Sequence, residues 1–153
     1  KDSFTRLWWM STTPDPLANN RNVLEEYSKQ MNRLLATGKY NSGKRPSEHL
    51  ISQNAFAIDN GGSIPSNVII APNTDSHSTY LIKCKEKGLP IHPARMPMQL
   101  PEFFIKMLTE SGDIVLDCFA GSNTTGYCAE KLNRKWISVE ANKDYYMGSK
   151  YRF

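Results

Sequence analysis

A glycine turn between an expected strand and an expected helix constrains this chain more than any other feature. Residues 114–118 form a short apolar run bounded by turn residues, residues 124–132 can form a helix, and residues 136–140 form a second apolar run. Gly121 lies before the helix, where a residue without a side chain lets the backbone turn tightly. Strand, turn, helix and strand make a βαβ unit. This unit predicts an α/β fold with a parallel sheet covered on both faces.

The same turn indicates where a ligand binds. Gly121 allows a close approach to the backbone, and the start of the following helix presents free N–H groups to a polar or anionic group. Glu140 ends the second strand, 19 positions after Gly121. In nucleoside-binding βαβ units, a carboxylate at about this spacing accepts hydrogen bonds from ribose hydroxyls. An ordinary glycine turn followed by a strand-end acid is the alternative interpretation, because the spacing alone does not exclude it.

Three further segments have recognisable patterns. Residues 4–13 are rich in β-branched and aromatic types, which predicts a strand with either Trp8 or Trp9 in the core. Apolar residues at helical spacing predict an amphipathic helix over residues 22–38, which ends at a glycine. A second helix is expected to begin at Pro101 and to end before residues 111–112, since proline fits the first turn of a helix.

The composition of residues 39–66 predicts a long irregular loop. They are polar and glycine-bearing, and they contain Lys39, Lys44 and Arg45. A structureless segment of this length in a compact domain is usually functional or mobile. The cations can contact DNA phosphates or base edges, and the alternative is a solvated loop with no ligand.

The composition favours a basic, intracellular protein. The chain has 19 Lys and Arg against 15 Asp and Glu, a net charge of +4 and a pI near 9.0, which suits a polyanionic partner such as nucleic acid. Its longest strongly apolar run, residues 67–72, is far short of the roughly 20 residues that cross a bilayer. The three cysteines lack C-x-x-C spacing, so reduced thiols and no zinc site are expected. We therefore expect a cytoplasmic protein without a membrane segment.

Several motifs together resemble a known family. Residues 119–126, preceded by Asp117 and followed by residues 134–140, resemble the S-adenosylmethionine motif of DNA amino-methyltransferases. Residues 92–105 are similar to the cofactor-binding segment that precedes this motif in the β arrangement of the family. The similarity continues through residues 14–24, 45–47 and 64–68, and so covers nearly the whole chain.

The resemblance implies a fold and a set of site residues. The fold is the three-layer, Rossmann-like α/β fold of S-adenosylmethionine-dependent methyltransferases, here partial and with an irregular target-recognition segment. The division expected is residues 1–38 with a strand and helix of the catalytic domain, 39–80 for target recognition and 81–153 for the cofactor, in one structural unit. The implied S-adenosylmethionine-binding residues are His92, Pro93, Asp117, Phe119, Ala120, Gly121, Ser122, Asn123, Thr124 and Glu140. The implied contacts to double-stranded DNA are Lys39, Lys44, Arg45 and Ser47.

The implied activity is transfer of a methyl group to an exocyclic amino nitrogen of DNA, with cytosine N(4) preferred over adenine N(6). A bacterial, archaeal or phage restriction-modification system would fit. Asn123 replaces the glycine of the commoner family loop, a variant associated with the cytosine N(4) branch. Methylation of cytosine carbon 5 would instead require a cysteine nucleophile after a proline, and none of the three cysteines follows a proline.

One family motif is absent from the chain. The catalytic tetrapeptide, Asp, Asn or Ser followed by Pro-Pro and an aromatic residue, has no match, since no two prolines are adjacent. No catalytic residue is therefore assigned. The chain looks like the carboxyl-terminal portion of such an enzyme and is expected to be inactive without an amino-terminal half or a second subunit. The alternative is a non-catalytic cofactor- or DNA-binding fragment or a subunit of a split methyltransferase.

Two implied cofactor residues have competing interpretations. Phe119 either lies along the adenine or packs in the core behind its strand. His92 either contacts the cofactor or only closes a turn.

Overall fold

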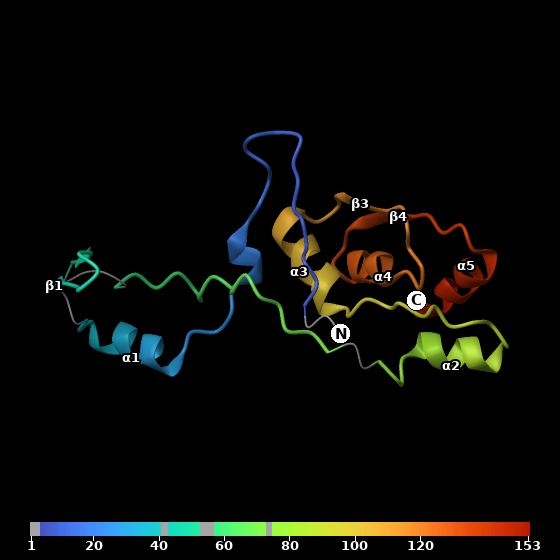
Figure 1. Ribbon diagram of the computed structural model, residues 1–153, viewed down its shortest axis with the longest axis horizontal. Helices are drawn as coiled ribbons and strands as arrows, with labels where there is room; N and C mark the ends of the chain where they lie inside the picture. Colours follow the sequence, from blue (N-terminus) through green and yellow to red (C-terminus); the bar gives the residue numbers. More distant parts are fainter. Residues whose placement is uncertain (1–3, 41–42, 53–56, 73–74) are drawn as a thin grey trace.

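The computed structural model describes residues 4–40, 43–52, 57–72 and 75–153. The chain forms a carboxyl-terminal body and an arm that extends from it (Figure 1). Its accessible surface is 11779 Å², whereas a compact monomer of this mass exposes roughly 7,900 Å². The fold is therefore open, and much of its apolar surface faces solvent.

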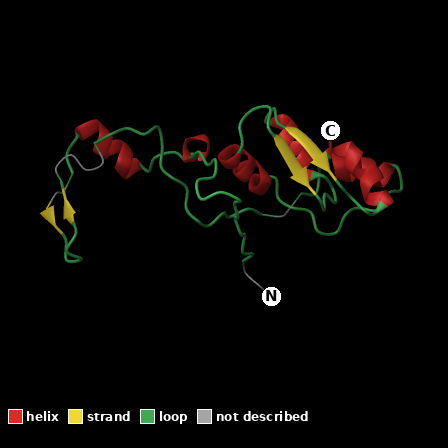
Figure 2. Cartoon of the chain, turned by 90° about the horizontal axis from the view of Figure 1, so that it is seen from above, coloured by secondary structure: helices red, strands yellow, loops and turns green. Residues whose placement is uncertain are grey.

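The body contains the expected βαβ unit. Strands β3 (Ile114–Asp117) and β4 (Lys135–Ser138) are parallel, with Ile114 opposite Lys135, and α4 (Thr124–Lys131) connects them. The two strands lie side by side in Figure 2. The α/β fold predicted from the glycine turn is confirmed, with element bounds within about two residues of those expected.

Only one face of this sheet is covered by the described residues. Helix α3 (Gln99–Leu108) packs with α4 around Ile105, Cys128 and Ala129, and the half-buried Val115 and Trp136 join them. On the opposite face four apolar residues are each more than half exposed: Ile114 and Leu116 in β3, Ile137 in β4, and Val139 directly after β4. The expectation of a sheet covered on both faces is therefore wrong for the residues described.

A second small core joins three elements that the sequence patterns did not predict. Helix α2 (Thr79–Glu86) packs against α5 (Lys143–Ser149) and the 3-10 helix η2 (Lys150–Arg152). Tyr80, Leu81 and Cys84 form its centre. Gly148 lies so close that an added Cβ would be 3.1 Å from the Cys84 sulfur. This core places α2 and η2 beside the glycine turn of the βαβ unit.

The amino-terminal segment departs from the prediction. Residues 4–13 form no strand, and the expectation that one tryptophan is buried is wrong, since Trp8 and Trp9 are 82% and 51% exposed. A strand requires a neighbouring chain to accept its backbone hydrogen bonds, and no described residue pairs with this segment. The chain is hydrogen-bonded to the body at the start of η1 (Asn20–Val23), where the N–H of the N-cap residue Asn19 donates to the Met107 carbonyl oxygen at 2.8 Å.

The arm (residues 29–52) holds a helix and a hairpin. Helix α1 (Lys29–Thr37) is shorter than the expected residues 22–38, because the Ser28 hydroxyl caps it at Met31 N. Strands β1 (Gly43–Lys44) and β2 (Leu50–Ile51) are antiparallel and lie within the segment predicted to be irregular. A bridge between Glu25 and Ser63 joins the two chain segments at the base of the arm. None of the described helices is long and apolar enough to span a membrane.

Candidate functional site

The carboxyl ends of β3 and β4 meet at a loop that we call the cofactor loop (residues 118–123). The Gly121 N–H donates to Glu140 Oε2 at 2.8 Å, and the Asn142 N–H donates to Glu140 Oε1 at 2.8 Å. The hydrogen bond from Asn142, and then that from Gly121, hold the pKa of Glu140 below its usual range. The carboxylate is therefore ionised at neutral pH. Each of its oxygens keeps one lone pair for a ligand hydroxyl.

His92 lies directly against this loop. A Cβ on Gly121 would lie 3.0 Å from His92 Nε2, and the Gly121 φ of +53° is in the left-handed region. The imidazole is held by an Nδ1 hydrogen bond to the Ala94 carbonyl oxygen at 3.1 Å and by an edge contact with Tyr145. The structure thus brings His92, Gly121 and Glu140 together, although they come from three separate segments of the chain. A side chain at position 121 would be strained both by the backbone conformation and by the imidazole.

Three of the implied cofactor residues point into the protein. Ser122, Asn123 and Thr124 are 3%, 4% and 3% exposed. The Asn123 side-chain oxygen accepts from Gly126 N at 3.2 Å and from the Ser138 hydroxyl at 2.7 Å, so it caps α4 and ties the loop to β4. Asn123 adopts a φ of +57°, which asparagine tolerates better than most residues. These side chains therefore shape the loop and hold it against α4 and β4.

The remaining implied cofactor residues lie at the open side of the loop. Phe119 is 92% exposed, so the alternative of core packing is wrong for the described chain. Asp117 accepts from the Phe119 N–H at 3.0 Å, and the Ala120 N–H donates to the Val139 carbonyl oxygen at 2.9 Å. Pro93 is exposed beside His92. The loop thus carries an exposed phenyl ring, and its Gly121 N–H bonds to an ionised carboxylate, two groups suited to a ligand with a flat ring and hydroxyl groups.

Two residues that hold the loop in place were not predicted from the sequence patterns. Arg152, in η2, donates to the Ser122 carbonyl oxygen at 2.7 Å, and Tyr80, in α2, accepts from the His92 N–H at 2.9 Å. Both side chains are buried. No local periodicity signals them, because the partners lie 30 and 12 positions apart in sequence.

The cysteines take no part in this arrangement. Cys84 and Cys128 are buried and Cys118 is exposed, and all three are free. Burial raises the pKa of the Cys128 thiol to about 11, which keeps it protonated at neutral pH. Within the described ranges, no group of three His, Cys, Asp or Glu side chains could hold a metal ion.

The arm gathers the positive charge of the protein. Residues 29–52 contain five Lys and Arg and one Glu, so the rest of the chain has 14 basic and 14 acidic residues. Lys44 is 69% exposed at its side chain and lies 3.8 Å from Glu48, a weak ion pair. The Arg45 guanidinium lies 5.8 Å from the centre of the Tyr40 ring. Lys39 and Ser47 are also exposed on the arm, which is far from the cofactor loop in both views (Figures 1 and 2).

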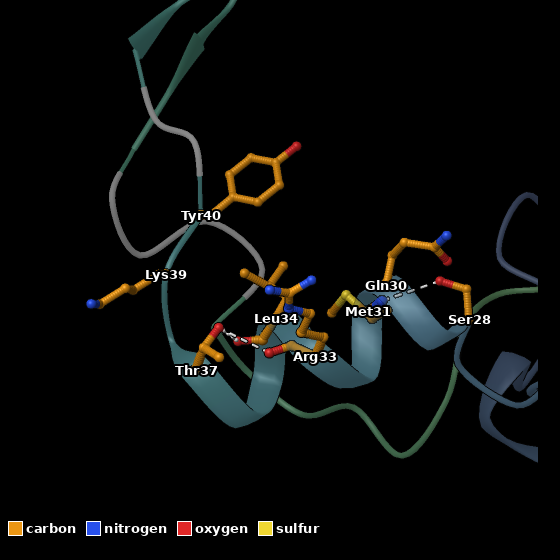
Figure 3. Close-up of a pocket in the computed structure, with 8 residues that line it drawn as sticks. All are labelled: Ser28, Gln30, Met31, Arg33, Leu34, Thr37, Lys39 and Tyr40. Carbon is orange, nitrogen blue, oxygen red and sulfur yellow. Dashed lines mark hydrogen bonds between the residues drawn. The ribbon is translucent and has the colours of Figure 1, made fainter.

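A hollow of about 620 Å³ runs along α1 in this arm. Figure 3 shows its lining, which combines apolar side chains with cationic and amide groups: Ser28, Gln30, Met31, Arg33, Leu34, Thr37, Lys39 and Tyr40. No residue of α1 is buried. The hollow belongs to the arm and has no contact with the cofactor loop.

A family model, N6_N4_Mtase, described as DNA methylase, matches residues 1–150. The chain belongs to the DNA methylase family. The family resemblance inferred from the motifs is thereby confirmed.

Relatives within the DNA methylases agree with this assignment. The Type II methyltransferase M.PvuII of Proteus hauseri is 46% identical over 155 residues, which cover 100% of this chain and 46% of the relative. M.HindIII of Haemophilus influenzae is 34% identical over 110 residues, 70% of this chain and 34% of the relative. The solved structure of the cytosine-N4-specific PvuII DNA methyltransferase matches with a TM-score of 0.57 and 52% identity, over 59% of this chain and 32% of that one. The chain thus spans about half or less of these relatives.

Proposed function

We propose that this chain supplies the cofactor-binding part and a DNA-contacting arm of a methyltransferase that transfers a methyl group from S-adenosylmethionine to the N(4) amino group of cytosine in DNA. The observation that carries the proposal is the Glu140 carboxylate, which accepts hydrogen bonds from the backbone N–H groups of Gly121 and Asn142 at a loop that also carries the exposed Phe119 ring. The identity to M.PvuII and the cytosine-N4 specificity of the enzyme whose structure matches support the choice of cytosine.

The residues of the loop fit this cofactor. Glu140 has one free lone pair on each oxygen for the two ribose hydroxyls, and Phe119 offers an exposed ring face to the adenine. His92 lies against the loop, and His92 and the adjacent Pro93 would line the same site. When bound, S-adenosylmethionine supplies a sulfonium methyl group that an amine can attack directly. The role of these residues is to bind and orient the cofactor.

The chain lacks groups that would position the target amine. The family tetrapeptide with adjacent prolines is absent from its 153 residues. A flipped base needs acceptors for its amino hydrogens and an aromatic surface for its ring. We therefore propose that residues 1–153 alone transfer no methyl group, and that a further polypeptide segment or subunit supplies these contacts. A non-catalytic binding module is the second candidate, and the same absence favours it.

The arm is the proposed DNA contact. All of the formal net charge of the protein lies in residues 29–52. Each phosphate that a lysine or arginine neutralises releases counterions, which makes binding depend on salt. We assign Lys39 and Lys44 to contacts with DNA phosphates, and Arg45 and Ser47 to contacts with base edges. Residues 39–80 would then form the target-recognition segment and residues 81–153 the cofactor segment.

Glu140→Ala tests the ribose assignment. Loss of the acceptor should weaken S-adenosylmethionine binding by about 1–3 kcal/mol, because two ribose hydroxyls lose their partner. Calorimetric titration of the full gene product that carries these residues measures this change. Glu130→Ala is the matched control, since Glu130 lies on α4 and accepts from the Trp136 indole, away from the loop. An unchanged dissociation constant for Glu140→Ala would reject the assignment.

A further inference from the structure

We propose that Arg152 is a positioning residue that fixes the cofactor loop in its binding conformation, an inference that rests on the proposed function. Arg152 lies in η2 and is 8% exposed. Its Nε donates to the Ser122 carbonyl oxygen at 2.7 Å, and its Nη2 donates to the Ser122 hydroxyl at 3.0 Å. Both donors belong to one rigid planar fork, so they fix the direction of the Ser122 carbonyl.

The direction of this carbonyl controls the turn around Gly121. The Ser122 carbonyl and the Asn123 N–H belong to one planar peptide unit. The Asn123 N–H donates to the Ala120 carbonyl oxygen at 2.7 Å. One end of the peptide is therefore held by Arg152 and the other closes the turn. Rotation of this peptide would break the turn that aims the Gly121 N–H at Glu140.

Arg152 also contacts Tyr80, the residue that holds the His92 backbone beside the cofactor loop. Its guanidinium lies 4.8 Å from the centre of the Tyr80 ring, which is 1% exposed. The Tyr80 hydroxyl accepts from the His92 N–H at 2.9 Å, and the His92 imidazole lies against Gly121. The Arg152 guanidinium thus supports the loop in two ways. It bonds directly to Ser122, and it packs on Tyr80, which holds the His92 that lies against Gly121.

The buried positive charge of Arg152 depends on its hydrogen bonds to the loop. No carboxylate among the described residues forms an ion pair with it, since the three ion pairs found there all involve lysines. Burial lowers the pKa of this guanidinium, and the charge of Asp75 offsets part of that effect. A buried cation without a paired carboxylate is costly unless its donors are satisfied. Here the oxygens of Ser122 satisfy two of them, so the loop and the cation stabilise each other.

Hydrogen exchange tests the positioning role without reference to any ligand. In the full gene product, Arg152→Met should speed exchange of the amides at residues 120–123 by about tenfold or more, because charge-assisted hydrogen bonds to the loop are lost. Arg152→Lys should give a smaller effect, since lysine keeps the charge but lacks the fork. Lys150→Met is the matched control, because Lys150 is exposed in the same 3-10 helix and lies over the Tyr146 ring. Its loop exchange should equal that of the parent. Loop exchange in Arg152→Met that matches the parent would overturn the proposal.

Cofactor binding provides the second readout. Arg152→Met should raise the dissociation constant of S-adenosylmethionine by about 10- to 100-fold, with partial rescue by Arg152→Lys. If Arg152→Met does not fold, the cycle of Arg152→Lys and Ser122→Ala decides. Both remove the same Nη2–hydroxyl bond, so their effects on loop exchange should be less than additive, and strict additivity would contradict the proposal. A parent that fails to bind S-adenosylmethionine would refute the proposed function, while the exchange data would still decide the role of Arg152.

Discussion

Gly121→Ala perturbs a position that combines a left-handed backbone with a close contact to His92 at the cofactor loop. The φ of Gly121 is +53°, and an added Cβ would lie 3.0 to 3.2 Å from three atoms of the His92 imidazole. The imidazole has little freedom to move, because its Nδ1 bonds to Ala94 and its ring contacts Tyr145. Gly88 provides a matched control, since its φ is +65° and an added Cβ meets nothing within 4 Å.

The two substitutions differ by a single contact. Both place a side chain in the left-handed region, which costs about 1–2 kcal/mol. Only Gly121→Ala also forces the His92 ring aside, and overpacking of this kind costs about 1–3 kcal/mol. We therefore expect destabilisation of about 2–5 kcal/mol for Gly121→Ala and of about 1–2 kcal/mol for Gly88→Ala.

Urea unfolding measures the stability of both variants, and calorimetric titration measures their affinity for S-adenosylmethionine. Gly121→Ala should lose affinity as well as stability, because the displaced imidazole alters the loop that holds Glu140. Gly88→Ala should bind as the parent does. Equal destabilisation and equal affinity in the two variants would refute the close approach of His92 to the cofactor loop.

Two further predictions concern the arm and the thiols. Lys44→Ala should weaken binding to every duplex similarly and lower the salt slope by about one unit, whereas Arg45→Ala should cost about 1–3 kcal/mol on the cognate site and little on random DNA. Fluorescence anisotropy of the full gene product across a salt series measures both, with Lys143→Ala in the body as the charge-matched control, and parent-like behaviour of both arm variants would contradict the DNA role. Alkylation of the native protein should modify Cys118 and spare Cys84 and Cys128, which are buried. Mass spectrometry counts the adducts, and rapid labelling of a buried thiol would contradict the described cores.

The centre of the fold was predictable because its signals are local. The apolar runs at β3 and β4, the glycine between them and Glu140 lie within a short stretch of sequence. Each has a specific physical requirement. Gly121 needs a left-handed backbone, and the helix after it needs a cap, which Asn123 provides. The family resemblance implied that His92 contacts the cofactor, but the contact of His92 with the loop was not predicted, since no local pattern joins residues so far apart.

The predictions that failed concern segments whose structure depends on partners distant in sequence. Residues 4–13 have the composition of a strand, but strand formation requires a ladder partner, and none of the described residues provides one. The long helix expected over residues 22–38 begins only after Ser28, because Asn19 caps the separate turn η1 and Ser28 caps α1. Arg152 and Tyr80 gave no signal, since their roles arise from packing between α2, η2 and the loop.

The methylated base formed on DNA is the most direct measurement of the central claim. DNA incubated with the full gene product and S-adenosylmethionine is digested to nucleosides, which are separated and identified by mass spectrometry. We expect N(4)-methylcytosine with the full gene product. If that product extends beyond residues 1–153, the isolated 153 residues should give none. N(6)-methyladenine in its place would contradict the choice of cytosine. No methylated base from a folded, S-adenosylmethionine-binding product, assayed together with the segment or subunit that carries the missing tetrapeptide, would contradict the methyltransferase assignment and favour a non-catalytic binding module.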